Sequence, residues 1–169
     1  MTHPGDELIG EPTIVFDRRR EIAATPEEIW PWLMALGKRR AGWYLPASVE
    51  RVLPPSRRAA RTLDPRWLAL ALGERIPDYG GRGATLEVAS IDPPRALVYR
   101  DERRGRPFSW ALLLEPLSPA RTRVHLRVRA RLRSRGFAHR AIALAAELFD
   151  ALTAELMLRG LAERVGGGG

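Results

Sequence analysis

The stretch from Phe137 to Val165 constrains the fold more than any other part of this 169-residue chain. It contains no proline and a single interior glycine, Gly160, and it is rich in alanine, leucine and glutamate, which favour helix. Its apolar residues recur at helical spacing: Ala141, Leu144, Ala145, Leu148, Leu152, Leu156 and Leu161. At about 1.5 Å per residue such a helix spans roughly 40 Å and therefore needs a broad apolar partner.

The part of the chain before this helix supplies the partner as short strands. Strand-like patterns occur at 13–23, 73–77, 85–91, 96–101, 108–114 and 122–133. Turn-forming residues separate the last four strands, which predicts an antiparallel sheet. The apolar run 67–72 fits helix and strand equally, so its structure stays open.

Two short helices are predicted between the first and second strands. Thr25 is a good N-cap, Pro26 suits the first helical position, and Glu28 completes a capping box. Gly37 ends this first helix. A second short helix is predicted over 47–53, before a pair of prolines. Residues 13–165 therefore form one domain, with flexible tails expected at 1–12 and 166–169.

The composition excludes several classes of protein. The chain has no cysteine, so disulfides and thiolate sites are not available, and its three histidines lie far apart in sequence. We expect neither a metal nor a cofactor. The first residues do not resemble a secretory signal, and no run of eighteen apolar residues predicts a membrane span. A cytoplasmic protein is expected.

Positive charge is concentrated in one part of the chain. The net charge is +8, yet 13 arginines against three acidic residues give the segment 95–140 a net charge of +10. In the strand 122–133, arginines and one histidine alternate with apolar residues and share one face. Burying so many charges without partners is costly, so we expect a solvated outer face. The alternatives are a phosphate-binding surface, for nucleic acid or anionic lipid, and a buried arginine that serves the acid group of a ligand. No aromatic residue interrupts the stripe to stack on bases, so nucleic acid is not expected.

The order of these elements resembles the helix-grip fold of the START-like or polyketide cyclase superfamily, SRPBCC. Several segments are similar to one uncharacterised bacterial branch of it: AATPEEIW at 23–30, RAGWY at 40–44, GERIP at 73–77, Thr122-Arg123 with Arg127 and Arg129, and MLRG at 157–160. The resemblance implies an α+β fold in which a curved antiparallel sheet wraps around the C-terminal helix. It also implies a cavity between the helix and the sheet, because members bind lipids, sterols, hormones or polyketides.

Aromatic residues are the best candidates for contact with a ligand. Trp43 and Tyr44 lie in the link between the two short helices, near the cavity mouth that the resemblance implies. Trp110 is expected to point inward from its strand, while the pattern leaves open which way Tyr99 points. Met157 on the last helix is a further candidate, although core packing is the simpler interpretation.

Chemistry is harder to assign. Tyr44, Glu50 and Asp78 are weak candidates for moving a proton. No serine lies in a nucleophile elbow, and the glycines at 80–83 lack the lysine of a phosphate loop. The leading hypothesis is a monomer or homodimer that binds a small hydrophobic or aromatic, lipid-like or polyketide-like molecule. The alternatives are a cyclase or dehydratase acting by proton transfer and, more weakly, a surface-binding module that uses the arginine stripe.

Overall fold

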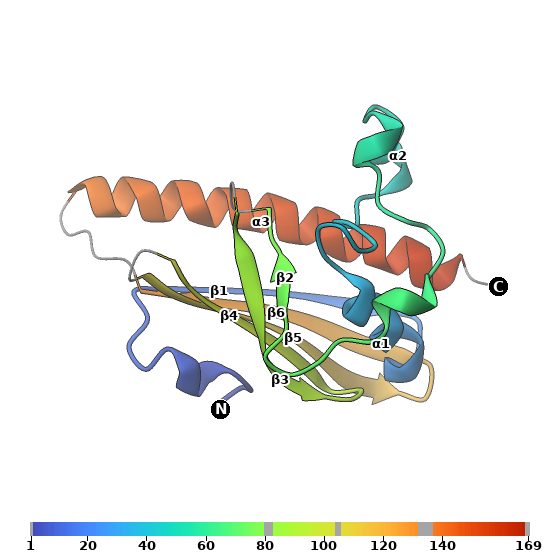
Figure 1. Cartoon of the computed structure of the whole chain (residues 1–169), viewed down its shortest axis with the longest axis horizontal. Helices are drawn as coiled ribbons and strands as arrows, with labels where there is room; N and C mark the ends of the chain where they lie inside the picture. The colour runs from blue at the N-terminus through green and yellow to red at the C-terminus, as the bar shows by residue number, and fades with distance from the viewer. Residues whose placement is uncertain (1, 80–82, 104–105, 132–136, 168–169) are drawn as a thin grey trace.

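A six-stranded antiparallel sheet lies beneath the long C-terminal helix, α3 (Phe137–Gly166), in this computed structural model (Figure 1). The structure describes residues 2–79, 83–103, 106–131 and 137–167. Side chains are described for the same residues apart from 102, 103, 106 and 137–151. The α+β class and the C-terminal helix that the sequence predicts are confirmed.

The last five strands form an antiparallel meander, and the first strand adds to its edge beside the last strand. The strands are β1 (Ile14–Ile22), β2 (Arg75–Pro77), β3 (Thr85–Asp92), β4 (Ala96–Arg103), β5 (Arg106–Ser118) and β6 (Arg121–Ala130). Their order in the sheet is β1-β6-β5-β4-β3-β2, and every neighbouring pair is antiparallel. Because β1 pairs with β6 from Ile14 to Ile22, the two ends of the domain meet in one sheet.

The segment between β1 and β2 contains one regular helix, α1 (Pro26–Ala35). Its capping box is confirmed: Thr25 accepts a hydrogen bond from the Glu28 backbone, and the Glu28 carboxylate accepts one from the Thr25 backbone. The helix predicted over 47–53 is a single turn, α2 (Ala47–Glu50). The open run 67–72 is neither helix nor strand beyond a 3₁₀ turn, η3 (Pro65–Trp67).

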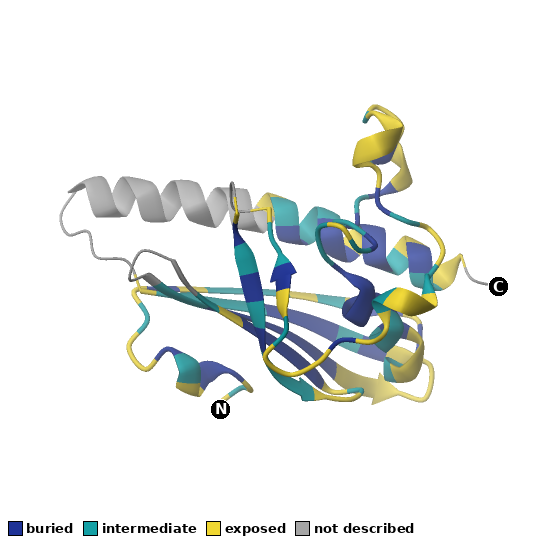
Figure 2. Cartoon of the chain, viewed as in Figure 1, coloured by how far each residue is buried: buried dark blue, intermediate teal, exposed yellow. Residues whose placement is uncertain are grey.

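The main core lies between the sheet and α3. Met157, Leu158 and Leu161 of α3 are fully buried there against sheet residues such as Leu97 and Leu112. Figure 2 shows this buried stripe along the C-terminal half of the helix. The predicted core residues Ala141, Leu144, Ala145 and Leu148 lie outside the described side chains.

Leu152 corrects the predicted apolar face of the helix. Its side chain is 61% exposed. At 100° per residue, position 152 lies about 180° around the helix from Leu161 and about 120° from Leu158. The spacing rule included Leu152 because it lies four residues after Leu148 and seven after Ala145, whereas the buried residues Leu158 and Leu161 lie on another face.

The opposite face of the sheet is covered in part by the N-terminal segment, which the sequence predicts to be a flexible tail. Figure 1 shows this segment on the side of the sheet away from α3. It contains a 3₁₀ turn, η1 (Asp6–Leu8); Asp6 and Ile9 are buried, and Leu8 packs on a small apolar cluster that includes Val98. At the other end of the chain, Gly166 is the last residue of α3.

This segment corrects in part the prediction of a solvated arginine face. Arg127 donates to Asp6 Oδ1 at 2.7 Å, and Arg129 lies 3.1 Å from the same oxygen. His125 is buried beside Asp17 of β1. The centre of the stripe is therefore covered and paired, whereas its ends, such as Arg121, are exposed as expected.

Candidate functional site

Four aromatic rings form a continuous row from the buried face of the sheet to the surface. Tyr99 of β4 stacks on its cross-strand neighbour Trp110 of β5, with ring centroids 5.6 Å apart. Trp110 stacks in turn on Trp43 at 5.7 Å, and Trp43 meets Tyr79 edge to face at 6.3 Å. Tyr99 is 1% exposed and Tyr79 is 53% exposed. We call these four residues the aromatic row.

A tight hairpin places Trp43 in this row. Gly37 and Gly42 exchange backbone hydrogen bonds of 3.2 and 3.0 Å, which closes the loop between them. Gly42 has φ +95°, and a Cβ on it would lie 3.0 Å from Cα of Ala59. Glycine is therefore required at position 42 by both its conformation and its neighbour.

An open cleft of about 790 Å³ adjoins the surface end of the row. Tyr79 belongs to both, and Gly42 lines the cleft next to Trp43. A second aromatic ring, Trp67, also lines it. The remaining walls come from the hairpin and from the loop after α2, and they carry five cations: Lys38, Arg39, Arg40, Arg57 and Arg58. We call this feature the cationic cleft.

Arg40 is the most enclosed of these cations. One of its Nη atoms donates to the Met34 carbonyl at 3.0 Å and also contacts the Trp67 carbonyl. The other Nη lies 4.0 Å from Glu74. Its buried Nε has no hydrogen-bond partner in the described part of the chain. Arg40 thus retains one buried donor beside an open cleft.

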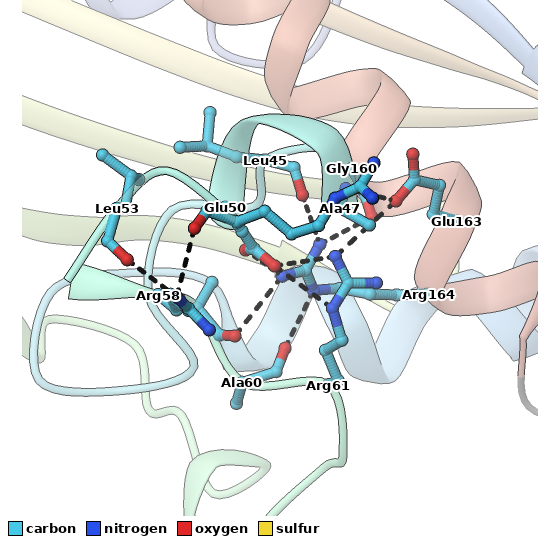
Figure 3. A network of polar contacts seen from close by, with 12 residues as sticks. Leu45, Ala47, Glu50, Leu53, Arg58, Ala60, Arg61, Gly160, Glu163 and Arg164 are labelled. Carbon is cyan, nitrogen blue, oxygen red and sulfur yellow. Dashed lines mark hydrogen bonds and ion pairs between the residues drawn. The ribbon is translucent and has the colours of Figure 1, made fainter. Parts of the chain in front are cut away.

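A buried ion pair holds the loop after α1 onto α3, as Figure 3 shows. Arg164 of α3 donates to Glu50 of α2 at 2.5 Å, and Arg61 donates to the other carboxylate oxygen at 2.7 Å. Arg164 also donates to the carbonyls of Leu45 and Ala60 at 3.0 and 2.8 Å. These bonds connect three segments that are distant in sequence.

This network determines the charge of Glu50. Burial alone would raise the pKa of its carboxyl, but hydrogen bonds from Arg164 and Arg61 outweigh burial and hold the pKa below its usual value. Glu50 is therefore ionised near neutral pH. A carboxylate held by two arginines is a poor proton donor and a weak base.

Tyr44 has a role in packing. It is fully buried, its hydroxyl donates to the Trp32 carbonyl at 2.8 Å, and the guanidinium of Arg164 lies 4.8 Å from its ring centroid. Burial raises the pKa of the Tyr44 phenol, and the charge of Arg164 opposes that rise only in part. The phenol stays protonated near neutral pH.

The structure brings together some of the residues predicted for the site and separates others. Trp43, Tyr99 and Trp110 meet in the aromatic row, and Tyr99 and Trp110 both point to the α3 side of the sheet. Met157 is fully buried in the core. Asp78 is half-buried and its carbonyl accepts from Lys38 at 3.4 Å, next to the cationic cleft.

Tyr99 adds a polar group to the buried end of the row. Its hydroxyl has no hydrogen-bond partner among the described residues. Burial raises the pKa of this phenol. A buried hydroxyl without a partner costs free energy, so it is a natural contact for a polar atom of a bound molecule.

Sequence reasoning missed Arg40, Tyr79 and Arg164. A signal for Arg164 was present: it follows Gly160 by four residues, so both lie on one face of the helix, and a glycine there allows close approach of a backbone. The cationic cleft had no such signal, because its walls come from separate loops.

Among the described residues, no cluster of histidine and acidic side chains could hold a metal ion. None of the helices in the same part of the chain is long and apolar enough to cross a membrane.

The fold defines a class: an α+β protein with an antiparallel sheet and a long C-terminal helix, consistent with a helix-grip arrangement. No protein-family model and no curated protein matches this chain. Solved structures of this class do. One from Rhodobacter sphaeroides has 23% sequence identity and a TM-score of 0.53, and the match covers 92% of this chain and 93% of that one.

Two other similar structures are those of named proteins. CalU16 from Micromonospora echinospora has 15% identity and a TM-score of 0.52, with 90% of this chain and 84% of that one covered. An HSP90 activator from Plasmodium falciparum has 15% identity and a TM-score of 0.52, with 91% and 96% covered. At such identities the likeness shows a shared fold and nothing about activity.

Proposed function

We propose that this protein is a START-like, polyketide cyclase-like (SRPBCC) protein of an uncharacterised bacterial branch. Its proposed function is to bind a small hydrophobic or aromatic molecule, lipid-like or polyketide-like, between α3 and the sheet. The order of the elements and the similarity of fold support the class. The aromatic row supports the function, and it is the single observation on which this proposal depends.

The geometry of the row favours binding over packing alone. A row of rings that serves packing alone would stay buried along its whole length. This row instead continues from Tyr99, which is buried, to Tyr79, which is half exposed. Stacked aromatic faces offer large apolar area to a flat ligand, and each pair of rings contributes about 0.5–1.5 kcal/mol beyond burial. The hydroxyl of Tyr99, which has no hydrogen-bond partner among the described residues, offers one polar contact at the inner end. Apolar walls with few polar groups are typical of small-molecule sites.

The contacts of the candidate proton carriers support binding over a proton-transfer reaction. The Tyr44 hydroxyl is engaged by a backbone carbonyl, and Glu50 is engaged by two arginines. Both groups already have strong partners, which disfavours proton transfer by either of them. Asp78 is the candidate that lies next to the cationic cleft.

The proposal is tested with 2-naphthamide, an uncharged aromatic probe, by titration calorimetry. Trp43→Leu removes a ring of the row and keeps apolar volume. Trp30→Leu is the matched control, because Trp30 is a partly buried tryptophan of α1 that packs on the same core outside the row. We expect Trp43→Leu to weaken binding about threefold to tenfold and Trp30→Leu to leave it unchanged.

Two outcomes oppose the proposal. The wild-type protein fails to bind the probe and carries no small molecule, by native mass spectrometry, when purified from its own host. Alternatively, both variants weaken binding equally, which would mean that the effect is one of stability.

A further inference from the structure

The cationic cleft has an unusual imbalance of charge. It combines five cations with no acidic side chain among the described residues that line it. Three of the cations come from the hairpin between Gly37 and Gly42, and two from the loop after α2. Like charges that face a shared space repel each other, so this arrangement costs free energy unless something negative lies between them.

Most of these charges are not neutralised by the protein. Arg39 and Arg57 are exposed, and neither side chain makes a hydrogen bond or ion pair with the residues that the structure describes. Arg58 donates to the carbonyls of Leu53 and Arg51, which are uncharged acceptors, so its charge remains. Arg40 has Glu74 as a partner, but only at 4.0 Å.

One cation also retains a buried, unused donor. The Nε of Arg40 has no partner in the described part of the chain, although the rest of its guanidinium is held by backbone carbonyls. Such a donor is costly to leave without an acceptor. Guanidinium groups bind carboxylates and phosphates with two parallel hydrogen bonds, so an anion is the natural acceptor.

The same cleft has aromatic walls. Trp67 and Tyr79 line it, and Tyr79 connects it with Trp43 and the rest of the aromatic row. Cations and exposed ring faces in one space match a ligand that has both a ring and a negative group.

We propose that the cationic cleft binds the anionic group, a carboxylate or a phosphate, of an aromatic molecule whose ring reaches the Trp43–Tyr79 end of the row. This inference rests on the proposed function and specifies the class of ligand. The arginines hold the anion at the mouth, and the row holds the apolar part. Arg39 and Arg57 attract and orient the ligand, while Arg40 fixes its inner oxygen.

The test compares three probes that share one ring system: 2-naphthoate, 2-naphthyl phosphate and the uncharged 2-naphthamide. Their affinities are measured by calorimetry at about 20 mM and about 200 mM salt. The two anions separate a carboxylate site from a phosphate site. The test variant is Arg39→Gln/Arg57→Gln. The control, Arg19→Gln/Arg95→Gln, removes the same charge from exposed arginines outside the cleft.

We expect one of the two anions to bind at least about tenfold more tightly than 2-naphthamide at low salt. The cleft variant should reduce this advantage about threefold to tenfold, and the control variant should not. Affinity for 2-naphthamide should be equal in all three proteins. Higher salt should weaken the anions alone.

The outcomes distinguish this inference from the proposed function. If the anions and 2-naphthamide bind equally, or if the control variant weakens the anions as much as the cleft variant, the inference is wrong and the proposed function stands. If none of the three probes binds, the inference is wrong, and if the protein purified from its own host also carries no small molecule by native mass spectrometry, the proposed function is wrong as well.

Discussion

Gly160 of α3 lies directly on the backbone of Leu45, so that a Cβ on residue 160 would lie 2.6 Å from the Leu45 nitrogen and carbonyl carbon. Real Cβ atoms essentially never come within 3.0 Å of such neighbours, so the approach depends on glycine at position 160. One turn later, Arg164 donates to the Leu45 carbonyl at 3.0 Å. The two residues of α3 together fix the position of the segment that carries Trp43 and Tyr44.

Gly160→Ala should destabilise the protein although alanine is the better helix former. The gain in helix propensity is about 1 kcal/mol, but the added methyl group would overlap backbone atoms that cannot rotate away. We expect a net loss of about 1–3 kcal/mol in the free energy of unfolding, measured by urea titration. Gly166→Ala is the control, because nothing lies within 4 Å of that position. An equal effect at the two glycines would contradict the close packing.

Arg164→Met should be among the most damaging substitutions in α3. It leaves Glu50 buried with one arginine fewer and removes bonds to four backbone carbonyls, those of Leu45, Ala59, Ala60 and Gly160. Breaking a buried ion pair from one side typically costs about 3–5 kcal/mol. Arg159→Met is the matched control, since it breaks an exposed ion pair with Glu155 on the same helix, worth at most about 1 kcal/mol.

The double variant Arg164→Met/Glu50→Gln provides a further check. Because the two side chains interact directly, the loss should be smaller than the sum of the two single losses. If the two single losses in the free energy of unfolding simply add in the double variant, the 2.5 Å contact between Arg164 and Glu50 contributes little to stability.

Local patterns in the sequence were sufficient to predict the framework. Apolar side chains recur every two residues along the strands. Thr25, Pro26 and Glu28 mark the start of α1 within four residues. Such signals do not depend on distant parts of the chain. The inward direction of Trp110 was predicted for the same reason, because it alternates with Ser109 and Ala111.

The rest of the site depends on contacts between distant residues. Glu50 and Arg164 are separated by 114 positions, and nothing in the residues around Glu50 distinguishes it from a surface carboxylate. The stacking of Tyr99 on Trp110 depends on the register of β4 against β5, which no single strand encodes. The N-terminal segment is rich in glycine and proline, so its docking on Arg127 and Arg129 was not visible locally.

Two tyrosines with different surroundings allow a matched comparison. Tyr44→Phe removes a buried hydrogen bond to Trp32, and we expect a loss of about 0.5–1.5 kcal/mol in the free energy of unfolding. Tyr99→Phe removes a buried hydroxyl without a partner among the described residues, so stability should stay equal or rise. Chemical denaturation of the ligand-free proteins measures both. A larger loss for Tyr99→Phe than for Tyr44→Phe would show that the Tyr99 hydroxyl is satisfied within the protein.

Acid should destabilise the protein through its paired carboxylates. Burial raises the pKa values of Asp6 and Glu50, but hydrogen bonds and nearby positive charges, led by Arg127 for Asp6 and by Arg164 for Glu50, together outweigh burial, so both folded-state pKa values lie below the usual 3.8 and 4.5. In that range the unfolded chain binds protons that the folded chain does not. The stabilisation is therefore complete above about pH 5 and is lost progressively as the pH falls through the folded-state pKa values.

Asp6→Asn isolates the contribution of the N-terminal segment to this acid response. The variant keeps the side-chain shape but loses the charge that pairs with Arg127 and Arg129, and we expect it to be less stable at pH 7 by about 1–3 kcal/mol. Because protonation removes the same charge from the wild-type protein, the difference between the two should shrink as the pH falls below 3.8. Glu7→Gln, at an exposed neighbouring position, should change stability by less than about 0.5 kcal/mol at either pH. Urea unfolding at a series of pH values measures the free energy of unfolding of all three proteins. If the difference in this free energy between wild type and Asp6→Asn stays constant with pH, the N-terminal segment is not held on the sheet by the charge of Asp6.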